Sequence, residues 1–298
     1  MSQTVGMLGI GIMGSAMSAN LMRAGFAVVG YDVLDERRRA FAAAGGIAAR
    51  SLSEVAERAD ILISVLPSAA ALEAVAGPDG ICAAARPGLV LVESSTLPIE
   101  DKQRAHDALA AAGVAMLDCP LSGTGAQAVT GDLSVYGSGE RAAYDRCLPV
   151  FAGFARSTHY LGEFGNGSRM KFVANLLVAI HNASAAEAFV LGMKAGLDPK
   201  MIYDVIADGA GNSRMFEVRG PMMVRGDYDA ATMKVQVWQK DMKIIGEFAR
   251  ELDCPTPLLS TSAALYTAAM AQGRGTQDTA AVCAVLEEMA RLHRPGRE

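Results

Sequence analysis

Residues 5–14, VGMLGIGIMG, decide the fold of the N-terminal half of the chain. Val5 to Ile10 is a short apolar run of the kind that forms a buried strand, and Met13 to Ala24 is typical of a helix. Gly9, Gly11 and Gly14 lie at their junction with the G-x-G-x-x-G spacing of a dinucleotide-binding turn. A strand, this turn and a helix in succession predict the first part of a domain that holds a dinucleotide.

Each glycine of the turn has a separate task. Gly9 permits the tight turn, Gly11 lets the backbone approach a pyrophosphate, and Gly14 allows the helix to pack closely on the strand. Ile12 and Met13 open the helix, whose N-terminal N–H groups favour an anion. We therefore expect all five residues to contact the cofactor.

Asp32 stands at the end of the second predicted strand, Ala27 to Tyr31, about 20 residues beyond the turn, where dinucleotide-binding domains place an acid. An acid there accepts hydrogen bonds from the adenine ribose and repels a 2′-phosphate, so it favours NAD over NADP. Val33 follows, where an NADP site would more comfortably place arginine. Residues 37–39 are all arginine and keep NADP as the alternative, although we interpret them as a solvated helix face.

Short β-branched runs alternate with alanine-rich helical stretches through the first half of the chain. The predicted strands are Val5–Ile10, Ala27–Tyr31, Ile61–Leu66, Leu89–Glu93 and Val114–Leu117. The predicted helices between them are Met13–Ala24, Glu36–Ala44, Ser53–Arg58 and Glu100–Ala112. This alternation predicts an α/β fold with a doubly wound parallel sheet of the Rossmann type.

Two further predicted strands, Leu133–Tyr136 and Ser157–Tyr160, precede a second half that is helical. The predicted helices there are Lys171–Lys194, one opened by Asp198 and Pro199, Ala231–Leu252, Pro257–Ala271 and Asp278–Arg291. Glycines between residues 162 and 167 mark the boundary. We expect a Rossmann domain over residues 1–163 and an all-α domain over residues 164–298, joined by the long helix.

Composition argues against several classes of ligand. The 298 residues are 51% hydrophobic and carry a formal net charge of -5, which argues against nucleic acid. We expect no membrane span, because the most apolar run, Phe172 to Ile180, is interrupted by Asn175. The 5 cysteines are odd in number and contain no C-x-x-C pair, so we expect neither a disulfide framework nor a metal site, and a reducing cytoplasm fits best.

Ligands of open parallel sheets bind beyond the carboxyl ends of the strands. The loops predicted at those ends are Leu66-Pro67-Ser68, Ser94-Ser95-Thr96 and Asp118 to Gly125. The segment 122–125 (SGTG) can point several backbone N–H groups at one anion, which suits a carboxylate, although a flexible turn has the same composition.

Oxidation of an alcohol by hydride transfer requires a base for the hydroxyl proton. Lys171 is a better candidate than the scattered histidines, because it stands at the start of a long apolar helix with Asn175 one turn later on the same face. A lysine in a domain cleft loses hydration, and its pKa falls toward the working range. For an isolated lysine, extension to solvent at a helix end is the alternative.

Several motifs, in order along nearly the whole chain, resemble the β-hydroxyacid dehydrogenases, typified by 3-hydroxyisobutyrate dehydrogenase and tartronate semialdehyde reductase. They are Gly9–Leu21 (GIGIMGSAMSANL), Tyr31-Asp32, Leu66-Pro67, Ser94–Thr96, Asp118–Gly123, Gly165–Asn175 (GNGSRMKFVAN) and Lys240-Asp241. The resemblance implies a Rossmann-type domain, an all-α domain and a long helix that joins them. It also implies NAD(P)-dependent oxidation of a small 3-hydroxy carboxylate, or reduction of the matching semialdehyde or keto acid.

The resemblance also implies the roles of individual residues. Lys171 matches the family's catalytic lysine, which acts as the general acid/base, and Asn175 matches its substrate-contacting asparagine. Ser122 and Gly123 match the loop that binds the substrate carboxylate. The expected cofactor contacts outside the glycine turn and Asp32 are Leu66, Pro67, Thr96 and Lys240.

One departure from the family concerns the substrate loop, which usually reads Ser-Gly-Gly but here reads Ser122-Gly123-Thr124. Thr124 adds a methyl group and a hydroxyl, so we expect a smaller pocket or an additional hydrogen bond to the substrate. Ser213 falls where family members line the substrate pocket, and we expect it to help select the substrate's side chain.

Three other functions stay open. A 6-phosphogluconate dehydrogenase would carry an equivalent of Lys171, but a much longer helical domain and usually a His-Asn pair where this chain has Ala174-Asn175. Imine reductases generally lack a lysine at the catalytic position. A non-catalytic NAD-sensing module would not need Lys171 and Asn175 together. The family resemblance further implies a homodimer or homotetramer.

Overall fold

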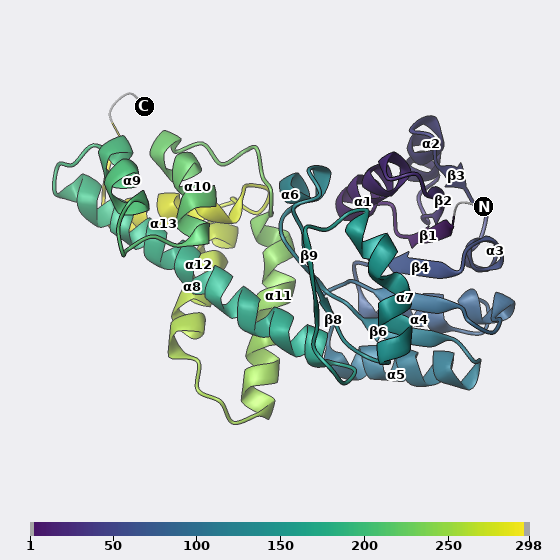
Figure 1. The fold of residues 1–298 in the computed structure, drawn as a ribbon. Coiled ribbons are helices and arrows are strands. Elements are labelled where there is room, and N and C mark those ends of the chain that lie inside the picture. Colours follow the sequence, from purple (N-terminus) through teal and green to yellow (C-terminus); the bar gives the residue numbers. More distant parts are fainter. Residues whose placement is uncertain (1–2, 295–298) are drawn as a thin grey trace. The chain divides into compact units, whose positions relative to one another are not determined.

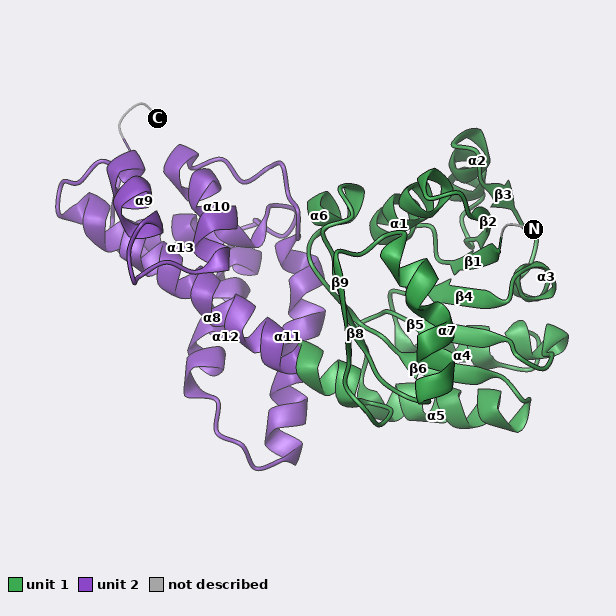
Figure 2. Cartoon of the chain, viewed as in Figure 1, with its two compact units in different colours: residues 1–171 green, residues 172–298 purple. Residues whose placement is uncertain are grey.

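The computed structural model of the protein describes residues 3–294 and contains two compact units. Unit 1 comprises residues 1–171 and unit 2 comprises residues 172–298 (Figure 2). The division falls after Lys171, inside one long helix, and not at the expected boundary between residues 163 and 164. An unbroken helix runs through the point where the compact units part, and the expected boundary stays a prediction.

A 6-stranded sheet forms the centre of unit 1 (Figure 1). Its strands are β1 (Thr4–Leu8), β2 (Ala27–Tyr31), β3 (Ile47–Ala48), β4 (Ile61–Ser64), β5 (Val90–Glu93) and β6 (Ala115–Asp118). All neighbouring pairs are parallel, and the strand order is β3-β2-β1-β4-β5-β6. This is the order of a Rossmann dinucleotide-binding domain, so the predicted fold class is confirmed.

Helices cover the sheet, and a small second sheet follows it in the sequence. The helices of unit 1 are α1 (Ile12–Arg23), α2 (Asp35–Ala43), α3 (Leu52–Arg58), α4 (Ala69–Ala76), η1 (Ile81–Ala84), α5 (Ile99–Ala111), α6 (Gly125–Val129) and α7 (Arg141–Ala152). The second sheet contains β7 (Leu121–Ser122), β8 (Ser134–Gly137) and β9 (Ser157–Tyr160). Strand β7 is antiparallel to β8, and β9 is parallel to β8.

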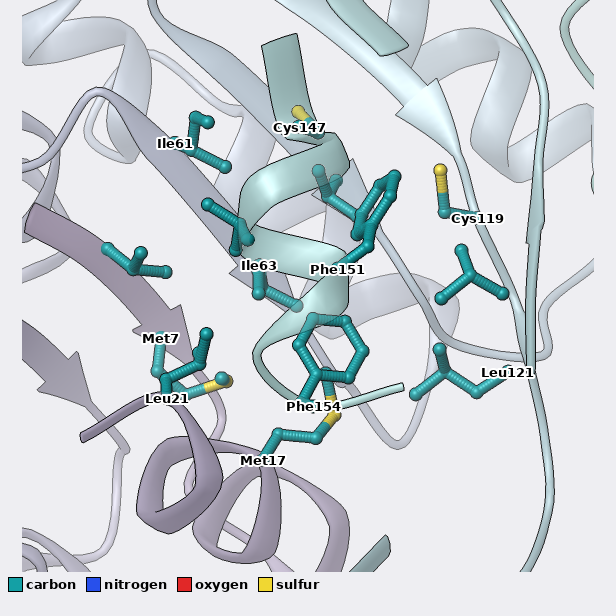
Figure 3. Close-up of a cluster of buried hydrophobic side chains, with 14 of the residues drawn as sticks. Met7, Met17, Leu21, Ile61, Ile63, Cys119, Leu121, Cys147, Phe151 and Phe154 are labelled. Atoms are coloured by element: carbon teal, nitrogen blue, oxygen red, sulfur yellow. The ribbon is translucent and has the colours of Figure 1, made fainter. Parts of the chain in front are cut away.

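Both faces of the large sheet are buried, which explains why its strands read as continuous apolar runs. Along β4, Ile61 and Ile63 belong to one hydrophobic cluster, while Leu62 between them belongs to the other. The first cluster also receives Phe151 of α7 and Phe154 just beyond it (Figure 3). Residues alternate between two cores, and the strand ends are left as the places for polar side chains.

Unit 2 is helical. Helix α8 (Asn166–Lys194) begins in unit 1, and α9 (Pro199–Ala207), α10 (Arg214–Arg225), α11 (Val235–Glu251), α12 (Pro257–Ala271), η2 (Thr279–Ala281) and α13 (Val282–Met289) follow. The side chain of Asp198 accepts a hydrogen bond from the Met201 N–H, so this predicted helix start is confirmed. The rings of Phe189, Tyr203 and Phe216 stack in the core of the unit.

Several elements were not predicted, for identifiable reasons. Strands β3 and β7 have 2 residues each, too few for an alternating pattern. Helices α7 and α10 contain Pro149 and Pro221, residues that ordinarily interrupt a helix. Both helices persist because their buried faces pack into the core, with Phe151 in α7 and Phe216 in α10. Tertiary packing here overrides local propensity.

Helix α8 bears on the expectation of no membrane span, which stays a prediction. Its 29 residues are long and apolar enough, by length and composition alone, to cross a membrane. The helix is apolar beyond the run from Phe172 to Ile180, because alanines recur at positions 183, 185, 186 and 188. Phe172, Ala179 and Phe189 on this helix are buried, whereas Val173, Leu177 and Leu191 are exposed.

The five cysteines are free thiols with very different exposure, and this gives a direct test of the packing. Cys254 is exposed, whereas Cys147 and Cys283 are buried, and burial raises the pKa of each of these two thiols to about 12. Because only the thiolate reacts, a thiol-alkylating reagent at about pH 8 is expected to modify Cys254 first in the native protein. Mass spectrometry of partially labelled protein checks the order. Labelling of Cys147 as fast as Cys254 would contradict the core of Figure 3.

Candidate active site

The glycine turn has the tight geometry that its sequence predicts. Gly9 has φ +93, and a Cβ there would lie 2.3 Å from the carbonyl oxygen of Val65. A Cβ on Gly14 would lie 2.0 Å from the carbonyl oxygen of Gly9, so α1 starts in direct contact with the end of β1. Gly11 is the N-cap residue of α1, which begins at Ile12. The helix N-terminus is thus left open to an anion.

Asp32 is held rigidly just beyond the end of β2. Its Oδ2 accepts a hydrogen bond from the Ile10 N–H at 2.8 Å, and its Oδ1 accepts one from the Leu34 N–H at 3.0 Å. The carboxylate is therefore attached to the glycine turn itself. Arg37 donates to Oδ2 at 3.2 Å with its side chain half exposed, and Arg38 donates to the Asp32 carbonyl oxygen. The expected solvated helix face did not include these two contacts.

Two of the predicted cofactor loops are tied together. The Leu66 N–H, after β4, donates to the hydroxyl of Ser95 at 2.7 Å. The Ser95 N–H in turn donates to the Glu93 carboxylate at 2.9 Å, at the end of β5. Pro67 and Thr96 are the next residues along these loops. Glu93 was not predicted as part of the site, and only its position as an acid at the end of an apolar strand could have indicated it.

The predicted substrate loop is more ordered than a flexible turn. Ser122 ends β7, Gly123 has φ +135, and Thr124 caps α6. The Gln127 N–H donates to the Thr124 hydroxyl, and the Thr124 N–H donates to Oε1 of Gln127 at 3.0 Å. This capping box leaves the loop one backbone N–H fewer for an anion than the sequence indicates. A Cβ on Gly125 would lie 2.8 Å from Cγ2 of Ile12, so this loop touches the glycine turn.

Unit 2 brings together two predicted site residues and Asp241, which the sequence indicated only as part of a family motif. Nδ2 of Asn175 on α8 donates to Oδ2 of Asp241 on α11 at 2.9 Å, and Asn175 is buried. Nζ of Lys240 lies 3.6 Å from Oδ1 of Asp241. Asp241 thus orients the amide that the sequence assigns to the substrate. The Ser213 hydroxyl caps α10 by accepting from the Phe216 N–H at 3.1 Å.

Lys171 is the last residue of unit 1 and is half-buried in α8. The helix continues without a break to Asn175, so the two side chains project from the same side at a spacing of one turn. Within residues 3–294, no group of three or more His, Cys, Asp or Glu side chains is placed to hold a metal ion.

The residues at the carboxyl edge of the large sheet fit a dinucleotide. A Cβ added to Gly11 would meet only a guanidinium nitrogen of Arg37, at 3.7 Å. Space therefore remains for a pyrophosphate against the N-terminus of α1. The Asp32 carboxylate, fixed beside that turn, suits a ribose diol.

Comparison with known proteins extends this fit to nearly the whole chain. Residues 4–162 match the family described as the NAD binding domain of 6-phosphogluconate dehydrogenase, and residues 165–286 match the family described as NAD-binding of NADP-dependent 3-hydroxyisobutyrate dehydrogenase. L-threonate dehydrogenase of Cupriavidus necator is 37% identical over 284 residues, which cover 95% of each chain.

Two solved structures show the same architecture. The 3-hydroxyisobutyrate dehydrogenase of Salmonella typhimurium is 35% identical with a TM-score of 0.85, and the match covers 95% of this chain and 100% of that chain. The 3-hydroxyisobutyrate dehydrogenase of Mycobacterium tuberculosis with L-serine is 30% identical with a TM-score of 0.86, and the match covers 96% and 99%. The chain therefore belongs to the β-hydroxyacid dehydrogenase family and is an NAD(P)-dependent oxidoreductase that acts on a CH–OH group.

Proposed function

We propose that this protein prefers NAD and transfers a hydride between it and a small 3-hydroxy carboxylic acid, or the matching semialdehyde or keto acid, with Lys171 as the general acid/base. The observation that supports this most strongly is the start of α8. Its first turn is hydrogen-bonded to Asp118 at the carboxyl end of β6, and Lys171 follows one turn later. Ligands of this fold bind at that same edge of the sheet.

The nicotinamide supplies the hydride acceptor or donor when it is bound. The protein's own residues hold the substrate and move the proton. Ser122, Gly123 and Thr124 hold the substrate carboxylate, and Asn175, oriented by Asp241, holds the substrate near the reacting carbon. Lys171 removes the hydroxyl proton during oxidation and returns it during reduction.

The other residues of the proposed site bind the cofactor or select the substrate. The residues proposed to contact the cofactor are Gly9, Gly11, Ile12, Met13, Gly14, Asp32, Leu66, Pro67, Thr96 and Lys240. Ser213, at the start of α10, is proposed to select the side chain of the substrate. A homodimer or homotetramer in the cytoplasm belongs to the same proposal, supported by five free thiols and by exposed apolar residues such as Val173 and Leu191 on α8.

The reaction is tested by following NAD and NADP reduction with a panel of short hydroxy acids. The panel includes 3-hydroxyisobutyrate and L-serine, which the relatives' names indicate, and 2-hydroxy acids of the same size as controls. L-Threonate is assayed separately, because it carries hydroxyls on both carbon 2 and carbon 3. We expect turnover with at least one 3-hydroxy acid and none with the matched 2-hydroxy acids. Tight NAD binding without turnover of any 3-hydroxy acid would contradict the proposed reaction.

The preference for NAD is expected to depend on the charge of Asp32. Asp32→Asn keeps one oxygen, which can accept from either the Ile10 or the Leu34 N–H, but removes the charge that repels a 2′-phosphate. It also frees Arg37 from its ion pair. The ratio of NADP to NAD affinity is therefore expected to rise about tenfold or more, equivalent to about 1.4 kcal/mol. Fluorescence titration with both dinucleotides measures the ratio.

The control is Arg37→Gln, in which Asp32 keeps its charge and loses its partner. Its ratio of NADP to NAD affinity is expected to fall, because the acid is unneutralised and the nearby cation is gone. If both variants bind NAD and NADP as the wild type does, Asp32 does not set the preference.

A further inference from the structure

Three neighbouring strands of unit 1 end in buried polar residues, although the rest of each strand is apolar. Ser64 ends β4, Glu93 ends β5 and Asp118 ends β6, and all three are fully buried. They occupy matching positions across the sheet, Ser64 beside Glu93 and Glu93 beside Asp118. A row of this kind lies at the edge where ligands of this fold bind, which gives it a role to explain.

Lys102 of α5 reaches this row from inside the protein. Its side chain is fully buried, and its Nζ lies 2.7 Å from Oδ1 of Asp118 and 3.8 Å from Oε1 of Glu93. Burial acts to lower the pKa of Lys102, but the Asp118 and Glu93 carboxylates outweigh it and raise the pKa above its usual value. The ammonium group therefore stays charged at neutral pH. Buried ion pairs of this kind often contribute little net stability, so stability alone explains the cluster poorly.

The cluster of Ser64, Glu93, Asp118 and Lys102 has two arms, and the arm at Asp118 holds the start of α8. Oδ2 of Asp118 accepts a hydrogen bond from the Ser168 N–H at 2.7 Å, and Oδ1 accepts one from the Ser168 hydroxyl at 2.8 Å. The Gly167 N–H donates to the hydroxyl of Ser138 at 2.9 Å, and this hydroxyl donates to the Asp118 carbonyl oxygen at 3.1 Å. A carboxylate at the first turn is also favoured by the helix dipole.

This arm leaves the first turn no room to shift. A Cβ on Gly167 would lie 2.4 Å from the carbonyl oxygen of Tyr136 and 2.5 Å from that of Asp118. The backbone of α8 therefore rests directly on β6 and β8. Lys171 follows one turn later, so the position of its backbone depends on this contact.

The other arm holds the predicted cofactor loops. Glu93 accepts hydrogen bonds from the hydroxyls of Ser64 and Ser95 and from the Ser95 N–H. The Ser95 hydroxyl accepts from the Leu66 N–H, so Glu93 fixes the backbone at the ends of both β4 and β5. Lys102 joins this arm to the one that ends at α8.

We propose that Asp118 and Glu93 are positioning residues of the active site, and that Lys102 connects them. Asp118 fixes the turn of α8 that presents Lys171, and Glu93 fixes the loops of Leu66 and Thr96 that receive the cofactor. This inference rests on the proposed acid/base role of Lys171. It requires the two carboxylates to have different effects, because each one supports a different part of the reaction.

The test combines hydrogen exchange of the full-length, cofactor-free protein with kinetics. In Asp118→Asn, the amides of residues 167–171 are expected to exchange about tenfold faster or more, since the turn opens locally. Turnover is expected to fall about tenfold, with cofactor affinity within about twofold of wild type. In Glu93→Gln, cofactor affinity is expected to fall about tenfold, with exchange at residues 167–171 unchanged. Lys102→Met is expected to show both effects.

Two further variants keep the test decisive. Ser168→Ala retains all three charges and removes one hydrogen bond to Asp118, so it gives a smaller increase in exchange even if Asp118→Asn does not fold. The matched control is Asp278→Asn, which breaks the buried ion pair with Arg219 in unit 2. It is expected to lower global stability while exchange at residues 167–171 stays that of the wild type.

Two results would overturn the positioning role. One is unchanged exchange at residues 167–171 in both Asp118→Asn and Ser168→Ala. The other is the same kinetic profile for Asp118→Asn and Glu93→Gln. The acid/base role fails by a different result, full turnover in Lys171→Ala, which leaves the exchange data unaffected.

Discussion

Lys171→Ala is expected to lower turnover by on the order of 10² or more while the affinity for NAD stays nearly unchanged. Removing the amine leaves no group on this turn of α8 to take the hydroxyl proton or to stabilise the developing alkoxide. The residues of the dinucleotide turn lie far from Lys171 in the sequence and are not altered. Steady-state kinetics with a responsive 3-hydroxy acid and a separate NAD titration measure the two quantities.

The matched control is Lys194→Ala, which removes the exposed lysine at the last turn of the same helix. Its turnover is expected to stay within about twofold of wild type, since it costs only a favourable contact with the helix dipole. Wild-type turnover in both Lys171→Ala and Lys194→Ala would end the assignment of Lys171 as the acid/base. An equal loss of turnover in the two variants would show an effect of helix stability and not of proton transfer.

Gly14→Ala is expected to weaken NAD binding on the order of 100-fold, equivalent to about 2.7 kcal/mol. The added methyl group would lie 2.0 Å from the carbonyl oxygen of Gly9, so α1 must move away from the end of β1. That movement withdraws the helix N-terminal N–H groups from the pyrophosphate. Overpacking is also expected to cost about 1–3 kcal/mol of folding stability. NAD titration and urea unfolding measure the two effects.

The control for this substitution is Gly246→Ala in α11, where an added Cβ meets nothing within 4 Å. The same methyl group there is expected to raise stability by about 0.5–1 kcal/mol, because alanine favours the helix. NAD binding is expected to stay that of the wild type. Wild-type NAD affinity in Gly14→Ala would mean that the turn does not hold the pyrophosphate as proposed.

Local patterns were sufficient for much of the fold. The glycine spacing after a buried strand predicted the β1–α1 turn, and Asp198 before Pro199 predicted the start of α9. Continuous apolar runs between helical stretches predicted five of the strands in the large sheet, because strands buried on both faces need no polar residues. Helices α7 and α10 were missed because tertiary packing retains Pro149 and Pro221 within them.

The polar contacts of the candidate site were not predictable in the same way. Arg37 lies only five residues after Asp32, yet no motif in the sequence gives the direction of its side chain. The capping box of Thr124 depends on Gln127, which a search for anion-binding N–H groups does not consider. Lys102, near the start of α5, carries no sign in the sequence that its side chain is buried rather than solvated.

The unbroken course of α8 through the division of the two units limits how this protein can vary. Domain junctions are usually flexible linkers that accept insertions and deletions. Here the division falls within a helix, in which one inserted residue rotates the helix side chains after it by about 100° around the axis. An insertion after Lys171 would turn Asn175 away from the side of the lysine. The proposed pairing of Lys171 with Asn175 on one side of the helix therefore requires the segment between them to keep its length.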